Sequence, residues 1–127
     1  MNNLDFLRIN WTFNQYGKTT APANIELSVT KRKDRYAFIF RNGAGEGLGD
    51  YAVVGSFGDL LAFRKCEKGE GGYKLSKRSK NDNYKELSVA IKYSGGQYDP
   101  FIGDYRRLLY NPDRKEFYVI KGNGGKV

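Results

Sequence analysis

Apolar and polar residues alternate in several short runs along this chain. The runs with this pattern are residues 6–13, 24–30, 36–41 and 84–92. A period of two is the period of a β-strand, whose successive side chains point to opposite faces of a sheet. No segment shows twelve or more residues with a clean helical period. The pattern therefore predicts a β-protein, and in residues 6–13 it predicts a strand with one apolar face, carried by Leu7, Ile9, Trp11 and Phe13.

Turn-forming residues separate further short strands. Residues 51–56 and 60–65 flank Phe57-Gly58-Asp59, which predicts a hairpin. Residues 103–110 and 115–121 flank a segment with the turn chemistry Asn-Pro-Asp, which predicts a final hairpin. Residues 73–77 are expected to form a short strand, and residues 42–50, with four glycines, a tight corner with at most one helical turn.

The strand at residues 36–41 is apolar on both faces, which is typical of a central strand or of one in a dimer interface. Sixteen glycines and ten tyrosines in 127 residues also favour a turn-rich β-protein. We expect one mainly β domain over residues 1–121. Its architecture is predicted to be a small β-barrel or a strongly bent antiparallel sheet with at most short helical turns, followed by a flexible tail at residues 122–127.

Several classes of chemistry are excluded or disfavoured by composition. The chain has no histidine and a single cysteine, Cys66, so a zinc site, a histidine-based triad and an internal disulfide are not expected. The glycine-rich segment 42–50 lacks the Gly-Lys-Ser/Thr of a phosphate-binding loop. We therefore expect no catalytic residues, no metal and no cofactor. No signal peptide or membrane-spanning run is apparent, and the cytoplasm is the expected compartment.

Positive charge gives the main functional prediction. The formal net charge is +8 and the sequence pI is about 9.6, a balance that favours polyanionic partners. Cations concentrate in residues 31–41 and 74–80, with tyrosines beside them that could stack on unpaired bases. The predicted nucleic-acid-binding residues are Lys31, Arg32, Lys33, Arg35, Tyr36, Arg41, Tyr73, Lys74, Lys77, Arg78 and Lys80. The alternative is that these cations are solvated strand edges that guard against aggregation.

One resemblance supports the same prediction. Residues 22–65 carry Ala44-x-Glu46-x-Leu48 after a strand, then Val53-Val54, then Gly58-Asp59. This order resembles the AbrB-type swapped-hairpin DNA-binding proteins, and also small phage and mobile-element proteins that share such a core. The resemblance implies an obligate homodimer that binds DNA through basic residues near the strand that enters the corner at residues 42–50.

A shorter resemblance points elsewhere. Residues 103–110 and 117–120 are similar to the final hairpin of RelE/ParE-type toxins, and RelE-type toxins cleave messenger RNA on the ribosome without a histidine. Arg106 and Arg107 would be the candidate residues in that case.

The main hypothesis is a nucleic-acid-binding protein, not an enzyme, with DNA favoured over RNA, possible homodimerisation and no membrane. A second hypothesis is a phage-type interaction protein that inhibits a host enzyme or defence complex, and the RelE-like ribonuclease is the third.

Overall fold

The computed structural model describes residues 25–77 and 84–121 of the 127-residue chain. The expected first strand (6–13), the expected tail (122–127) and two predicted site residues, Arg78 and Lys80, lie outside these ranges.

Within these ranges, ten strands form two antiparallel five-stranded sheets, with orders β6-β7-β2-β1-β8 (sheet I) and β5-β3-β4-β10-β9 (sheet II). Sheet I contains β1 (Leu27–Arg32), β2 (Arg35–Phe40), β6 (Ser76–Lys77), β7 (Lys85–Ala90) and β8 (Gly103–Tyr105). Sheet II contains β3 (Tyr51–Phe57), β4 (Leu60–Lys65), β5 (Tyr73–Lys74), β9 (Leu109–Asn111) and β10 (Glu116–Ile120). The predicted mainly β class is confirmed. The predicted β-barrel is not observed, because the two sheets do not close on each other.

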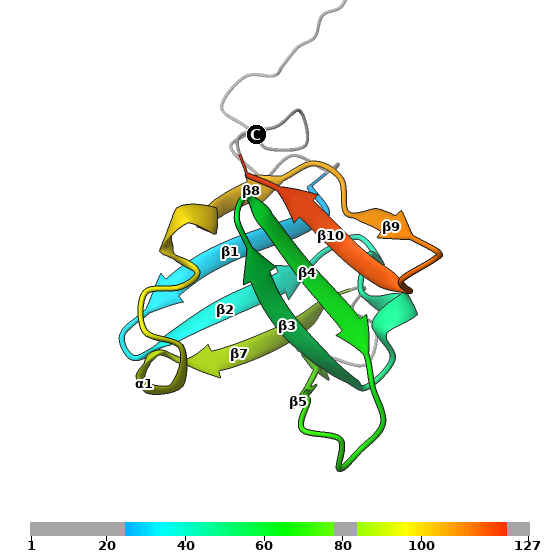
Figure 1. Cartoon of the computed structure of the whole chain (residues 1–127), viewed down its shortest axis with the longest axis horizontal. Helices are drawn as coiled ribbons and strands as arrows, with labels where there is room; N and C mark the ends of the chain where they lie inside the picture. The colour runs from blue at the N-terminus through cyan, green and yellow to red at the C-terminus, as the bar shows by residue number, and fades with distance from the viewer. Residues whose placement is uncertain (1–24, 78–83, 122–127) are drawn as a thin grey trace, which may run out of the picture.

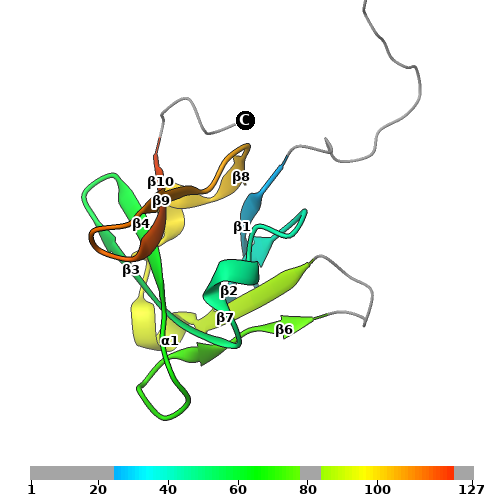
Figure 2. The ribbon, with the colours of Figure 1, turned by 90° about the vertical axis from the view of Figure 1, so that its right-hand side faces the viewer.

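The strands of sheet II cross in front of those of sheet I (Figure 1), and in the side view β3, β4, β9 and β10 lie opposite β1, β2 and β7 (Figure 2). The core cluster is made of buried side chains from both sheets. Phe63 on β4 lies edge-on to two rings of sheet I, with centroids 5.4 Å from Phe38 and 4.9 Å from Phe40. Aromatic pairs in this geometry add about 0.5–1.5 kcal/mol each beyond the burial of their area. The predicted central position of the strand at 36–41 is confirmed, since β2 lies between β7 and β1.

The predicted hairpin of β3 and β4 is also confirmed. Phe57 pairs with Leu60, so the turn is two residues long. Gly58 has φ of +59°, whereas Asp59 is not among the residues with positive φ. This is the arrangement of a type II′ turn, in which glycine at the first position lets the turn match the right-handed twist of the strands.

Two predicted strands are divided between the sheets. In the expected strand 73–77, β5 joins sheet II and β6 joins sheet I, and the buried Leu75 lies at the crossing point. In the expected strand 103–110, β8 pairs with β1, and only β9 forms the final hairpin with β10. The predicted single strand is therefore wrong in both places, because each segment connects the two sheets.

The helical elements are short, as expected. They are the 3-10 turn η1 (Glu46–Leu48) in the glycine-rich corner, the one-turn helix α1 (Ile91–Ser94) and the 3-10 turn η2 (Asp99–Phe101). Within the described residues, no helix is long and apolar enough to span a bilayer. The expected strand 84–92 ends at Ala90, where α1 turns the chain toward the end of the β1–β2 hairpin.

Candidate nucleic-acid interface

The turn between β1 and β2 carries four of the predicted site residues. Arg32 and Arg35 pair directly across the sheet, so Lys33 and Asp34 form a two-residue turn at the end of the hairpin. All five residues from Lys31 to Arg35 are exposed. The pairing of β1 with β2 therefore places Lys31, Arg32, Lys33 and Arg35 at one end of sheet I.

Helix α1 lies against the same turn. The backbone N–H of Ile91 donates to the Asp34 carbonyl at 2.9 Å, and Arg35 pairs with Ala90 at the end of β7. This contact brings Lys92 and Tyr93 beside the turn. Tyr93 is 76% exposed, and the Lys92 ammonium lies 5.1 Å from the centre of its ring.

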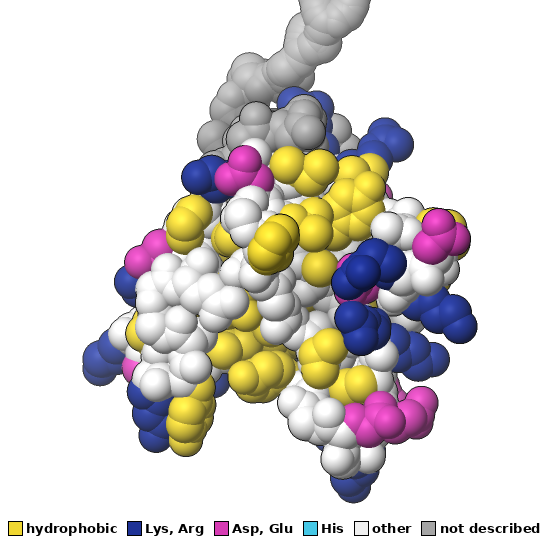
Figure 3. All heavy atoms as spheres, viewed as in Figure 1, with side chains coloured by type: hydrophobic (Ala, Val, Ile, Leu, Met, Phe, Trp, Pro, Cys, Tyr) yellow, Lys and Arg dark blue, Asp and Glu magenta, His cyan; other side chains and the backbone are white. Residues whose placement is uncertain are grey.

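We call this surface the basic corner and define it by Lys31, Arg32, Lys33, Arg35, Lys92 and Tyr93. Basic side chains gather at the edge of the molecule where the β1–β2 turn and α1 lie (Figure 3). Neither Lys92 nor Tyr93 was predicted as a site residue, because the sequence pattern ended a strand at residue 92 and placed residue 93 in the loop that follows. The neighbouring Gly95-Gly96 pair was the signal that the chain leaves the sheet here.

Three of the corner cations have acidic partners. Lys31 Nζ lies 3.2 Å from Asp99 Oδ1, Arg32 Nη1 lies 2.8 Å from Glu86 Oε2, and Arg35 Nε lies 3.5 Å from Asp34 Oδ1. The side chains of these cations remain about half exposed. Exposed ion pairs contribute at most about 1 kcal/mol to stability, so they can be exchanged for other contacts. An arginine also has five N–H donors, and these cations can therefore still bind an added anion.

Tyr36 was predicted to contact nucleic acid, and that prediction is wrong because its side chain is completely buried. Its hydroxyl donates to Asp99 Oδ1 at 2.7 Å and also lies 3.1 Å from the Gly95 carbonyl oxygen. Burial first, and then the bond and the charge of Asp99, raise the pKa of Tyr36 to about 12. Tyr36 therefore positions the segment that follows α1 rather than presenting a stacking surface.

Asp99 connects this buried hydroxyl to the surface. The hydrogen bond from Tyr36 and then that from Lys31 hold the pKa of Asp99 below its usual value. The carboxylate thus stays charged at neutral pH, and it ties η2 to both strands of the hairpin.

Two other predicted residues pack against the sheets. Arg41 is half-buried, with Nε donating to Ser28 Oγ at 3.0 Å and its guanidinium 5.4 Å from the Tyr84 ring centre. Tyr73 is half-buried and packs against the core. Both lie away from the β1–β2 turn, since Arg41 follows the opposite end of β2 and Tyr73 belongs to sheet II.

Lys74 and Lys77 are exposed, as predicted, but they do not join the basic corner. Lys77 pairs with Lys85 at the start of β7, whereas Arg35 pairs with Ala90 at its end. Five residues of strand separate these positions by about 17 Å. Lys74 and Lys77, the described cations of the second basic segment, therefore do not extend the basic corner across β7.

No described group of three acidic or cysteine residues is arranged to hold a metal ion. Cys66 is half-buried and lines a hollow of about 560 Å³ together with cations and acids, among them Lys65, Glu67 and Lys115. Arg106 and Arg107, the candidates from the second resemblance, are exposed in the β8–β9 connection.

The basic corner thus combines five cations, three nearby acids and one exposed ring. No protein-family model matches the chain, and no curated protein or solved structure matches it either.

Proposed function

We propose that the protein binds single-stranded nucleic acid at the basic corner. Lysine and arginine side chains there would hold phosphates, and one unpaired base would stack on Tyr93. The observation that carries the proposal is the exposed Tyr93 ring, fixed beside Lys92 and the β1–β2 turn by the Ile91–Asp34 backbone bond. An aromatic ring next to cations is the common arrangement of single-strand binding surfaces.

Charge and exposure support the same proposal. Lys33 is exposed and forms no ion pair with any described residue, and Lys92 has the Tyr93 ring as its neighbour. A phosphate can therefore approach both ammonium groups without first displacing a carboxylate. The paired cations would then exchange weak exposed ion pairs for phosphate contacts.

Fluorescence anisotropy with labelled single-stranded DNA, RNA and duplex DNA tests the proposal over a series of salt concentrations. Tyr93→Ala is expected to weaken single-strand binding by about 1–3 kcal/mol, the contribution of one stacked base. Tyr93→Phe, which keeps the ring, should bind like the original protein. Replacing Lys33 and Lys92 by alanine should lower the salt slope by about 1.4, or about 0.7 for each lost phosphate contact.

The matched control replaces Lys68 and Lys121, two exposed lysines elsewhere on the surface, and removes the same charge. If this control weakens binding as much as the corner variant, net charge alone drives association and the proposed site is wrong. The preference for DNA, the homodimer and the host-protein target stay predictions.

A further inference from the structure

The outer face of sheet II is apolar and is separate from the basic corner. The register pairs Phe57 with Leu60, Gly55 with Ala62, and Ala62 with Tyr118. Leu60, Ala62 and Tyr118 point away from the core, because residues next to them along the strands, Leu61, Phe63 and Val119, are buried. Phe57 and Gly55 lie on the same face, since each pairs directly with one of these outward residues. Hydrophobic side chains gather over β3, β4 and β10 on this face (Figure 3).

Phe57 and Gly55 give this face its shape. Phe57 is 85% exposed. Beside it lies a hollow of about 260 Å³, lined mainly by apolar residues of β3 and β4. A Cβ added at Gly55 would meet no atom within 4 Å, so the missing side chain leaves open space over the strand. Contiguous exposed apolar surface of this kind usually marks an interaction site.

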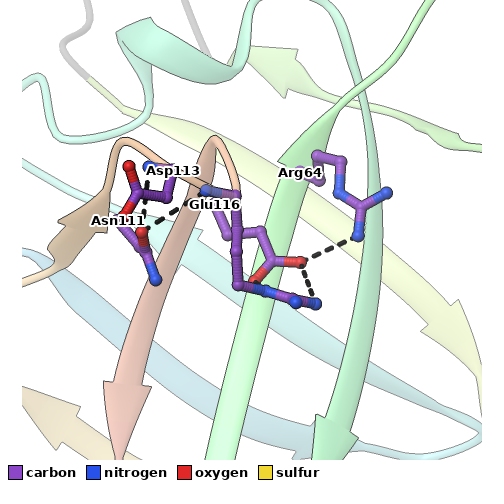
Figure 4. A network of polar contacts seen from close by, with 5 residues as sticks. Arg64, Asn111, Asp113 and Glu116 are labelled. Atoms are coloured by element: carbon purple, nitrogen blue, oxygen red, sulfur yellow. Dashed lines mark hydrogen bonds and ion pairs between the residues drawn. The ribbon is translucent and has the colours of Figure 1, made fainter.

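One end of the hollow is polar and fixed. Glu116 accepts a hydrogen bond from Arg64 at 2.8 Å and another from Arg114 at 2.9 Å (Figure 4). Asn111 Oδ1 in turn accepts the backbone N–H of Asp113 at 3.0 Å, which stabilises the β9–β10 turn that carries Arg114. An occupant of the hollow would therefore meet apolar surface bounded at one end by two arginines that donate to Glu116.

We infer that residues 6–13 of the same chain cover this face, with the side chains of Leu7, Ile9, Trp11 and Phe13 packed around Phe57 and over Gly55. These side chains alternate with Arg8, Asn10 and Thr12, so an extended segment would present one apolar side. Such a side is stable only against another apolar surface. In the described part of the chain, the outer face of sheet II is such an apolar surface.

The connection is long enough. The chain enters the described region at residue 25, next to Glu26, whose carboxylate accepts the backbone N–H of Leu108 at 2.8 Å. Leu109 follows and pairs with Tyr118 at the β9 edge of sheet II. Residues 14–24 reach up to about 36 Å when extended. Crossing from β9 to β3 requires three strand spacings, or about 14 Å.

Tethering favours this occupant over a separate molecule. A segment joined by a short flexible connection has an effective concentration in the millimolar range. A second copy of the chain, or a different protein, would have to compete with it for the same apolar face.

Trp11 is the single tryptophan of the chain, so its fluorescence reports on this contact directly. In the full-length protein we expect emission blue-shifted from that in urea, and acrylamide quenching several-fold weaker. Phe57→Ser removes the exposed ring, and Gly55→Gln fills the hollow with a polar side chain. Both should return the emission and the quenching most of the way to the values in urea, with an unchanged circular dichroism spectrum.

Tyr93→Ser is the matched control, since it removes another highly exposed aromatic residue, which belongs to the basic corner. It should leave the emission unchanged. Solvent-exposed emission in the original protein overturns the inference. So does a blue shift that neither Phe57→Ser nor Gly55→Gln alters, and so does protection that disappears on dilution, which would assign the face to a second copy.

Discussion

Replacing Tyr36 by phenylalanine tests the network that positions the basic corner. The ring is completely buried and lies edge-on to Tyr98, with centroids 5.4 Å apart. Phenylalanine keeps these contacts and removes only the hydroxyl, which donates to Asp99 Oδ1. A hydrogen bond to a charged group contributes about 1.5–3 kcal/mol. Because the Asp99 side chain is about half exposed, water can replace the lost donor. We therefore expect Tyr36→Phe to lower the free energy of unfolding by about 1.5 kcal/mol at pH 8.

The pH dependence gives a sharper signature. The pKa of Tyr36 is raised from 10.0 to about 12 in the folded protein. Above pH 10 the unfolded chain loses this proton while the folded protein keeps it, so the free energy of unfolding falls as pH rises. A difference of about two pKa units corresponds to at most about 2.7 kcal/mol over this window. The stability difference between the original protein and Tyr36→Phe should therefore close near about pH 11.

Urea unfolding followed by circular dichroism at several pH values from 8 to 11.5 measures both quantities. Burial also raises the pKa values of Tyr98 and Tyr105, but these residues are present in both proteins and cancel in the comparison. The control is Tyr93→Phe, which removes the hydroxyl of an exposed tyrosine and should leave the free energy of unfolding at pH 8 unchanged. Stability curves that stay parallel up to pH 11.5 would refute the argument for Tyr36.

Three further substitutions test other parts of the fold. Gly47→Ala would place a Cβ 2.5 Å from the Phe117 ring and should lower the free energy of unfolding in urea by about 1–3 kcal/mol. The added Cβ of Gly55→Ala meets no atom within 4 Å, so this variant should be neutral or more stable by up to about 1 kcal/mol, and equal losses in the two variants would contradict the described packing. Glu116→Gln should cost about 1 kcal/mol at pH 7. The hydrogen bonds from Arg114 and then Arg64 lower the pKa of Glu116, so the stability that the ionised carboxylate contributes is present above the ordinary pKa and is lost as pH falls through the lowered one. The free energy of unfolding should therefore fall less steeply with decreasing pH in the variant, and an equally steep fall in both proteins would argue against this. Phe38→Ala should lower the free energy of unfolding by about 3–5 kcal/mol in chemical unfolding, since the ring is completely buried between the sheets. A loss below about 1 kcal/mol would show that the core is not packed as described.

The strands could be predicted from the sequence because alternation and turn chemistry are local. The β3–β4 hairpin followed from Gly58 between two apolar runs. The division of residues 73–77 at Leu75 could not be predicted, because each half pairs with a strand distant in sequence. Strand pairing of this kind depends on tertiary contacts that a local pattern does not contain.

The site was predictable only in part, for a similar reason. The basic turn at residues 31–35 was correctly expected to be exposed. Tyr36 was assigned to the surface because it directly follows the cations of residues 31–35. Since β2 is apolar on both faces, alternation alone does not say which of its faces meets the core. Tyr93 was missed because α1 has a single turn, which is too short to show a helical period.

The most direct test of nucleic-acid binding at the basic corner is the salt dependence of single-strand affinity for three proteins. These are the original protein, the double variant Lys33→Ala/Lys92→Ala and the control Lys68→Ala/Lys121→Ala. We predict salt-dependent binding that weakens, with a lower salt slope, in the corner variant and to a clearly smaller extent in the control. No binding to any single strand at low salt, or equal weakening in the two variants, would contradict the proposed function.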